Sequence, residues 1–454
     1  MMMKAVVSVA AFLFVFSAAA ARPVARWDTV PYQFATGVLD VGVAAFHEKG
    51  VSVEFFVNGE KKFTAGERVR NRQSGIREFV FPFDASEYPD GPVEITAKAL
   101  TPGEDPCELG KIVIYANSGK SLGTRKVVWA DYANGNDFSP GTKSEPVRTL
   151  KRAVQKCGDG GVVLLKPGVY PSRMIGGGLS RRYWTMVMAA PGSKPGSVKL
   201  RPGRTGTDKL LFRNVVFECD VLDGYGTAVL GEDGSTSAWF DNCVFRNAHG
   251  RYAGETTPFG GRLTAYVTGG VTEDMTDGPG AVLIRSHKVR RIARNAFTPP
   301  ESGALVCDCT VEDLAPPDKV HEACLVKASG AGDGFVENLI VWSVKASKLR
   351  SHVFFGARWR DSAVVGLHAE PDEAPLVVTQ FAGDMENVVF ADVSTGSQTW
   401  QWVSPKNKTN MFRPKAVRLF SVKTAGMSGY DAPAEGDGAL LISETVPRDM
   451  FPGT

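Results

Sequence analysis

The chain has 454 residues, of which 43% are hydrophobic and 22% charged, so it is long and apolar enough to bury two hydrophobic cores. Its formal net charge of +3 is small, and no basic run with interleaved aromatic residues occurs, which argues against a nucleic-acid partner. The 49 glycines are typical of a fold with many tight turns.

Residues 1–21 have the pattern of a secretory signal peptide. Lys4 supplies the positive charge, Val6–Phe16 the apolar segment, and Ala18–Ala21 a cleavage site of small residues. We therefore expect a secreted protein, extracellular or periplasmic, with an uncleaved N-terminal anchor as the alternative. The apolar run is too short for a bilayer-spanning helix and no later segment is a candidate, so we expect no stable membrane span.

Residues 23–120 carry short alternating runs separated by turn signals, the pattern of a small β-sandwich. Asn58-Gly59 lies between two such runs and predicts a hairpin turn, and Glu78–Phe83 alternates Phe with other residues. The segment resembles bacterial immunoglobulin-like (Ig-like) modules found beside carbohydrate-active domains. That resemblance implies a spacer, with glycan binding as the alternative. The polar segment Asn117–Thr124 is the expected linker.

The stretch Asp131–Tyr170 predicts how the second domain, residues 124–454, begins. Val147, Leu150, Ala153 and Val154 form one apolar helix face, and an apolar strand follows at 162–165. A β-solenoid needs such a terminal cap, because its first coil otherwise exposes an apolar cross-section.

Three motifs in this stretch, NGND at 134–137, PGT at 140–142 and GVY at 168–170, resemble the opening of secreted β-helix proteins of the pectin-lyase-like superfamily. The resemblance implies an all-β fold: a right-handed parallel β-helix (solenoid) with an N-terminal capping helix, preceded by the small Ig-like β-sandwich. We interpret the polar residues of NGND as turn formers that seat the cap.

Short self-similar segments recur through the second domain and indicate stacked coils. Phe212–Phe217 (FRNVVF) and Phe240–Phe245 (FDNCVF) share an apolar frame around a central Asn, and 336–341 and 385–390 repeat it. The aligned polar positions predict a single ladder of stacked side chains with a structural role. Its members are Asn214, Asn242, Asp308, Asn338, Ser362 and Asn387.

Seven cysteines leave at least one unpaired in an exported chain. We expect most of them to be buried packing residues, with a single unassigned disulfide as the alternative. No CxxC pair occurs, so a structural zinc site is not indicated. Cys307 and Cys309 should lie on opposite faces of one strand.

Cationic residues concentrate between Arg285 and Arg360. Removal of a proton next to a carboxylate requires a base and a cation that neutralises the carboxylate, and Lys, Arg and His supply both. If the strand that ends near Lys327 stacks on the strand that leads to Arg358, the two lie on one face of adjacent coils. Such a pair resembles the chondroitinase-B and alginate-lyase branch.

We therefore select Lys327, Arg358 and His321 as candidate catalytic residues. The candidate substrate-binding residues are Arg285, His287, Arg350, His352 and Arg360. The lyase branch also uses a Ca²⁺ ion, so Ca²⁺ is the one cofactor that the resemblance implies, and we assign no residues to it.

The resulting hypothesis is a monomeric polysaccharide lyase that cleaves an acidic, uronate-containing polysaccharide by β-elimination. Whether the chain is an enzyme stays open at this stage. The alternatives are a non-catalytic glycan-binding or cell-surface β-helix protein and a β-helical glycoside hydrolase that uses a pair of carboxylates.

Overall fold

The computed structural model describes the chain from residue 21 onward, with gaps. The described residues are 21–122, 125–171, 175–315, 323–327, 335–350, 352–356, 358–371, 378–381, 385–396, 399–401, 414–424, 426–428, 440–447 and 450. Residues 1–20 lie outside these ranges, so the signal peptide stays a prediction.

The N-terminal part of the chain forms two small sheets that pack face to face, and we call this part the sandwich. The sheets have the orders β1-β3-β7-β6 and β2-β9-β8-β4-β5. Alternate side chains of both sheets, such as Phe55, Phe81 and Ile114, fill a shared core. Asn58 and Gly59 both have positive φ, which fits the predicted hairpin turn between β4 and β5. The strands are β1 (Val24–Trp27), β2 (Phe34–Ala35), β3 (Val38–Phe46), β4 (Ser52–Val57), β5 (Glu60–Ala65), β6 (Val69–Arg70), β7 (Arg77–Asp84), β8 (Gly91–Leu100) and β9 (Cys107–Ala116), with a short 3-10 helix at Ala85–Glu87.

Helix α1 (Leu150–Cys157) stands at the start of the solenoid, as the periodicity predicts. Val147, the first residue of the predicted apolar face, lies before the helix and is buried in a bridge to Ala130. It buries Leu150, Ala153 and Val154 and begins after Thr149, whose hydroxyl accepts the Arg152 N–H. The Asp137 carboxylate accepts hydrogen bonds from the backbone N–H groups of Arg148 and Thr149. The polar turn therefore seats the cap, as predicted.

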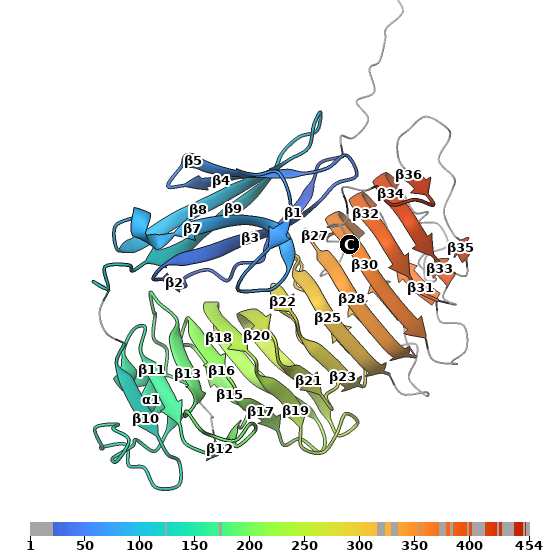
Figure 1. Ribbon diagram of the computed structural model, residues 1–454. Coiled ribbons are helices and arrows are strands. Elements are labelled where there is room, and N and C mark those ends of the chain that lie inside the picture. Colours follow the sequence, from blue (N-terminus) through green and yellow to red (C-terminus); the bar gives the residue numbers. More distant parts are fainter. Residues whose placement is uncertain are drawn as a thin grey trace, which may run out of the picture.

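The remaining strands run parallel to one another and stack into a β-solenoid (Figure 1). One continuous parallel sheet contains β10 (Val127–Ala130), β11 (Val162–Leu165), β12 (Gly168–Tyr170), β13 (Thr185–Ala189), β14 (Val198–Leu200), β15 (Gly203–Thr205), β16 (Leu210–Arg213), β17 (Val216–Cys219), β18 (Tyr225–Asp241), β19 (Val244–Asn247), β20 (Glu255–Thr268), β21 (Val271–Glu273), β22 (Leu283–Arg285), β23 (Lys288–Ile292), β25 (Leu305–Leu314), β27 (Phe335–Glu337), β28 (Ile340–Leu349), β30 (Arg358–Pro371), β32 (Met385–Ser394), β34 (Pro414–Lys423) and β36 (Leu440–Ser443). A second parallel sheet contains β24 (Asn295–Phe297), β26 (Cys324–Lys327), β29 (His352–Gly356), β31 (Val378–Phe381), β33 (Thr399–Gln401) and β35 (Gly426–Ser428). Among the described residues, no helix combines the length and the apolar character that crossing a membrane requires.

Inward-facing residues of successive coils form columns in the solenoid core. One column contains Val163, Val187, Phe212 and Phe240, which are partners in the strand register. Phe212 and Phe240 stack with ring centroids 5.4 Å apart and planes 9° from parallel. Each coil therefore buries its apolar side chains against the coils before and after it.

The polar residues that the sequence aligned as one ladder belong to two different turns, so the single ladder was wrong. Asn214, Asn242 and Asp308 all have positive φ and occupy one turn, where the Asn242 side-chain amide donates to the Asn214 side-chain oxygen over 2.7 Å. Asn338 and Asn387 occupy a second turn, at the other end of the same strands, and Asp361 holds the turn position between them in place of the predicted Ser362. Both turns require the left-handed conformation that Asn and Asp tolerate, which is why the motifs look alike.

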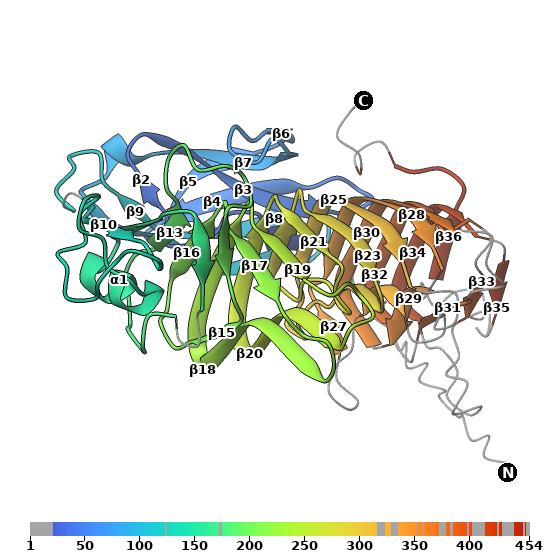
Figure 2. The same ribbon diagram turned by 90° about the horizontal axis from the view of Figure 1, so that it is seen from below.

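The sandwich docks on an outward face of the solenoid, and an apolar layer lies between the two domains (Figures 1 and 2). Phe46 of the sandwich meets Trp342 of the solenoid edge to face, with ring centroids 5.4 Å apart. This contact explains why outward positions of β25 and β28 are apolar.

All seven cysteines are buried and unpaired, as expected for packing residues. Cys307 belongs to the layer between the domains and Cys309 to the solenoid core, so they point to opposite sides, as expected. The reason is not strand alternation, which puts residues two apart on the same face. Asp308 between them has positive φ and turns the chain.

Candidate functional site

A groove of mixed polar and apolar lining follows the solenoid turn that contains Asp308, beside the edge of the sandwich. We call it the turn groove; its volume is about 350 Å³. The solenoid side is built from residues at or just after the left-handed turn position of successive coils. The sandwich side is the segment Gly75–Arg77. The lining solenoid residues are Cys307, Asp308, Trp342, Ser343, Lys345, Gly366, His368 and Asp392.

His368 and Asp392 form an ion-pair contact inside this groove. The imidazole Nε2 lies 3.2 Å from the Asp392 Oδ2, and the two side chains are 44% and 41% exposed. Solvent and substrate can therefore reach the imidazole while the carboxylate holds it. Asp392 has positive φ at the turn, and this backbone bend aims its side chain at the preceding coil.

Lys345 stands next to His368 on the neighbouring coil. The two residues are direct partners in the parallel register of β28 and β30. Partners in adjacent strands lie about 4.8 Å apart, so the ammonium and the imidazole can reach one bound group. Arg77 adds a second exposed cation from the sandwich side.

This arrangement can perform proton transfer next to an anionic group. A neutral imidazole accepts a proton, a carboxylate on its far side orients it and stabilises the imidazolium that forms, and cations neutralise a substrate carboxylate.

Two of the three candidate catalytic residues, Lys327 and Arg358, do not come together in the structure. The strand register puts Phe355 beside Lys327, whereas Arg358 begins β30 in the other sheet, opposite Phe335. The expected stacking of Lys327 on Arg358 was therefore wrong, because the chain changes sheets between Phe355 and Arg358. His321 lies outside the described residues. Catalytic roles for these three residues stay predictions.

Arg285 is placed between the domains. Its guanidinium NH1 lies 2.7 Å from the Asp28 Oδ2 and donates to the Asp28 backbone carbonyl over 3.0 Å. Glu78 lies in the same buried cluster, and burial together with the Asp28 charge raises its pKa well above the ordinary value. Arg285 thus fastens the sandwich to the solenoid.

His287 is fully buried in the solenoid. Its Nδ1 lies 2.7 Å from the Gly269 carbonyl oxygen, and its Nε2 lies 2.9 Å from the Thr272 hydroxyl. A carbonyl only accepts, so Nδ1 carries the proton and Nε2 accepts from Thr272. Burial lowers the pKa of His287 to about 4, and the ring is a neutral part of the core.

The other substrate-binding candidates also lie in intramolecular arrangements. Arg350 contacts the Asp313 carboxylate over 3.4 Å, and Arg360 bridges Glu337 and Glu386 on the coils either side at 3.0 and 2.8 Å. His352 is buried in β29. Substrate binding by the five candidates stays a prediction, and the structure gives each of them a carboxylate partner or a buried position.

The cationic residues around Arg290 are balanced by carboxylates on neighbouring coils. Arg246, Glu273, Arg290 and Glu312 follow one another along neighbouring coils, so opposite charges alternate in one outward column. Arg290 Nε donates to the Glu273 carboxylate over 2.7 Å. The sequence shows the charges close together, but only the register reveals that they are neutralised pairwise.

Sequence reasoning missed His368, Asp392 and Lys345. One signal could have found them: Lys345 and His368 each follow a turn residue, Ser343 or Gly366, by two positions. Recognising the turn as a column would have aligned both side chains on one outward line. Within the described residues, no three His, Cys, Asp or Glu side chains are placed to hold a metal ion.

No protein-family model and no curated protein matches the chain. Two solved structures are similar to it, both of GH136 lacto-N-biosidase from Eubacterium ramulus. The selenomethionine derivative is 11% identical with a TM-score of 0.37 and covers 73% of this chain and 68% of that chain. The native protein is 8% identical with a TM-score of 0.34 and covers 70% and 67%.

A likeness this distant assigns no activity. The class that the chain's own geometry defines is a mostly β protein, with a long parallel sheet wound as a β-solenoid and small N-terminal sheets.

Proposed function

We propose that the chain is a carbohydrate-active β-solenoid protein that cleaves an acidic polysaccharide by β-elimination in the turn groove. One observation carries the proposal: a histidine with an orienting carboxylate, His368 and Asp392, stands beside Lys345 on the next coil and faces Arg77 across the groove.

Each group has a defined part in the reaction. The His368 imidazole takes the C5 proton of a uronate, and the electron pair of that C–H bond forms the C4=C5 double bond. The C4–O bond breaks, and the leaving oxygen takes a proton from water. Lys345 and Arg77 neutralise the substrate carboxylate, which acidifies the neighbouring C–H. Asp392 orients the imidazole.

Hydrolysis by two carboxylates fits the groove less well. Asp308 and Asp392 both line it, but the coils of Ser343 and Gly366 lie between them. At about 4.8 Å per coil their Cα atoms are roughly 14 Å apart, whereas inverting glycosidases hold their carboxyl groups about 6.5–9.5 Å apart.

The finer description of the fold is part of the proposal. We propose that the solenoid is a right-handed β-helix of the pectin-lyase-like class, that the sandwich is an Ig-like module, and that the protein is exported. The sequence motifs around the cap and the signal-like residues 1–21 support this.

The test is incubation of the purified protein with alginate, polygalacturonate and hyaluronan, followed by the ultraviolet absorbance of the unsaturated product. We expect His368→Ala to lower the rate by about 10²–10⁴-fold, the usual contribution of a general base. We expect Lys345→Gln to raise KM, because it removes a cation that contacts the carboxylate.

His249→Ala is the matched control. His249 forms a similar contact, 2.6 Å from Nε2 to the Asp220 carboxylate, but does not line the turn groove. It should leave the rate unchanged. New reducing ends without absorbance would instead establish a glycoside hydrolase, and binding without turnover would establish a non-catalytic glycan-binding protein. An unchanged rate for His368→Ala would remove the assignment of the base.

A further inference from the structure

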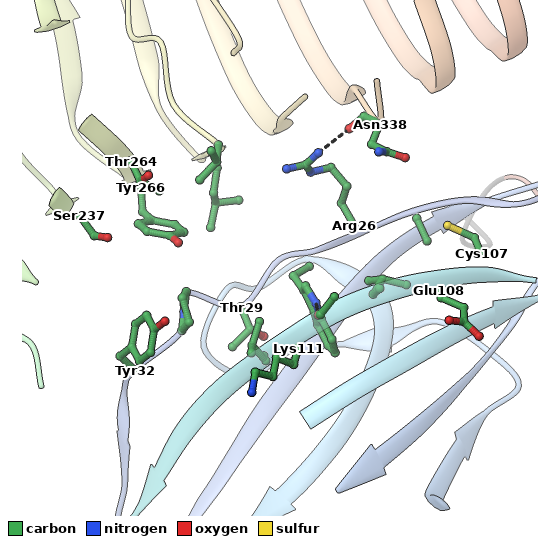
Figure 3. Close-up of a pocket in the computed structure, with 18 residues that line it drawn as sticks. Arg26, Thr29, Tyr32, Cys107, Glu108, Lys111, Ser237, Thr264, Tyr266 and Asn338 are labelled. Carbon is green, nitrogen blue, oxygen red and sulfur yellow. Dashed lines mark hydrogen bonds between the residues drawn. The ribbon is translucent and has the colours of Figure 1, made fainter. Parts of the chain in front are cut away.

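A second cleft lies between the domains (Figure 3). It lies beside the edge strand β1, whereas the turn groove lies beside Gly75–Arg77, near the other edge of the same sheet. We call it the inter-domain cleft; its volume is about 500 Å³. Strands β1 and β9 supply the sandwich wall. Ser237, Thr264 and Val282 supply part of the solenoid wall, and each directly precedes a strand segment that leads to the turn of Asn242, Gly269 or Ser286. The cleft therefore exists only when the two domains are docked.

Arg26 is the cation of this cleft, and in the described part of the chain no carboxylate pairs with it. Its NH1 donates to the backbone carbonyls of Ser302 and Asn338 over 2.8 and 2.9 Å. Burial lowers the pKa of its guanidinium to about 10, so it stays charged at neutral pH. Among the residues that the structure describes, no carboxylate forms an ion pair with it. A charge removed from water without a counter-ion favours binding of an anion.

The carboxylate that lines the cleft does not fill this role. Glu108 lies 2.7 Å from the Lys98 ammonium, so its charge is already paired. Lys111 is likewise paired with Glu94 at 2.6 Å. The uncompensated charge of the cleft is therefore the single positive charge of Arg26.

Three aromatic side chains line the same cleft. Trp27 and Tyr32 come from the sandwich and Tyr266 from the solenoid, and all three are half-buried on the cleft wall. The Trp27 Nε1–H donates to the Gly110 carbonyl over 2.7 Å, which fixes the indole. Burial raises the pKa of Tyr266, so its hydroxyl stays protonated and can donate a hydrogen bond. Aromatic faces carry negative charge density and attract the polarised C–H groups of a sugar ring.

Tyr32 is held in a strained backbone conformation. Its φ is 63°, which is uncommon for a bulky residue, and its N–H donates to the Val113 carbonyl over 2.6 Å. The Lys209 ammonium lies 4.7 Å from the centre of its ring. Backbone strain of this kind persists only where the surrounding structure holds the residue in place, and it is concentrated at functional sites.

We infer that the inter-domain cleft is a binding site for an anionic sugar residue, separate from the turn groove. The carboxylate of a uronate lies against the Arg26 guanidinium, the pyranose ring packs on the aromatic wall, and Tyr266 donates to a ring substituent. Because both domains build the cleft, the sandwich acts as a binding element and not only as a spacer.

The experiment is titration calorimetry with alginate, polygalacturonate and hyaluronan oligosaccharides, each compared with its carboxyl-reduced counterpart. His368→Ala is the background, so that no turnover occurs. We expect at least one acidic oligosaccharide to bind, and its reduced form to bind about tenfold or more weakly, since a charge-assisted hydrogen bond is lost. Arg26→Gln should remove that preference, and Tyr266→Phe should weaken binding about two- to tenfold.

Lys62→Gln is the control for Arg26→Gln. It also removes one positive charge from the sandwich, but Lys62 is exposed, paired with Glu60 and outside the cleft. Hydrogen exchange of residues 24–32 should slow when the ligand is added. Binding that ignores the carboxyl group, or that survives both Arg26→Gln and Tyr266→Phe, would overturn the inference. So would the absence of binding to all three acidic oligosaccharides.

The outcome is distinguishable from that of the proposed function. With Arg26 intact, loss of the turn groove through His368→Ala should leave cleft binding in place. The ultraviolet assay tests the turn groove and the calorimetric preference for the carboxylate form tests the cleft, so either proposal can fail while the other holds.

Discussion

The buried imidazole of His287 makes a prediction about the pH dependence of stability. The residue is enclosed by the solenoid core, and both ring nitrogens are hydrogen-bonded to uncharged groups. No carboxylate contributes to its pKa, which burial lowers to about 4. We expect the neutral ring to be required for folding, and His287→Gln to remove its titration.

The magnitude follows from the pKa in each state. Above pH 6.5, the ordinary value, the imidazole is neutral in both the folded and the unfolded chain. As the pH falls from 6.5 toward 4, only the unfolded chain takes up the proton, so the free energy of unfolding decreases. Between pH 7 and pH 5 this loss is about 2 kcal/mol.

The assay is denaturant unfolding of the solenoid at pH 7 and pH 5, followed by near-ultraviolet circular dichroism. Carboxyl groups also titrate in this pH range, so the loss in the free energy of unfolding is compared between the wild type and each variant. The wild type should lose about 2 kcal/mol more than His287→Gln. The exposed residue His249 provides the control, and His249→Gln should behave as the wild type. Equal losses in the wild type and His287→Gln would refute the buried neutral ring.

Three further predictions concern the contacts that hold the domains and the cap. Glu78→Gln should fold normally, because burial and a neighbouring carboxylate raise the pKa of Glu78 and favour its protonated form. The folded wild type keeps a proton that the unfolded chain releases, so wild-type stability should fall as the pH rises above 4.5. The variant should lose this pH dependence in thermal melts. Trp342→Ala should weaken docking by about 3–5 kcal/mol through loss of the contact with Phe46, and calorimetry should then show two separate transitions where the wild type shows one. Gly135→Ala should destabilise the cap by about 1–3 kcal/mol, because its Cβ would lie 2.4 Å from a backbone carbonyl oxygen, whereas Gly37→Ala meets no atom within 4 Å and should melt like the wild type.

The cap shows how much of the fold local patterns reveal. Helix α1 and strand β11 are short, and their contacts lie close in sequence, so periodicity and turn residues predict them directly. The hairpin at Asn58-Gly59 is local in the same sense. The two turns of the solenoid look alike because both need the same backbone conformation. A sequence motif therefore identifies the turn type without saying which corner of the coil it occupies.

The candidate site was less accessible from sequence. Cationic residues are conspicuous along the chain, but a charge such as that of Arg360 becomes uninformative once a neighbouring coil supplies carboxylates. The groups that make His368 a candidate base are far from it in the sequence: Asp392 lies on the next coil and Lys345 on the previous one. Register between coils depends on loop lengths that vary from coil to coil.

By itself, the sequence determined the parallel solenoid, its helical cap and the two-part organisation, because these depend on hydrophobic periodicity and turn chemistry within short segments. Only the tertiary structure decided which charges are neutralised, which histidine is buried, and where grooves remain open. Docking of the sandwich covers one face of the solenoid and leaves a cleft on one flank and a groove on the other. The physical reason is that burial and charge pairing are properties of neighbours in space, which residues far apart in the chain supply.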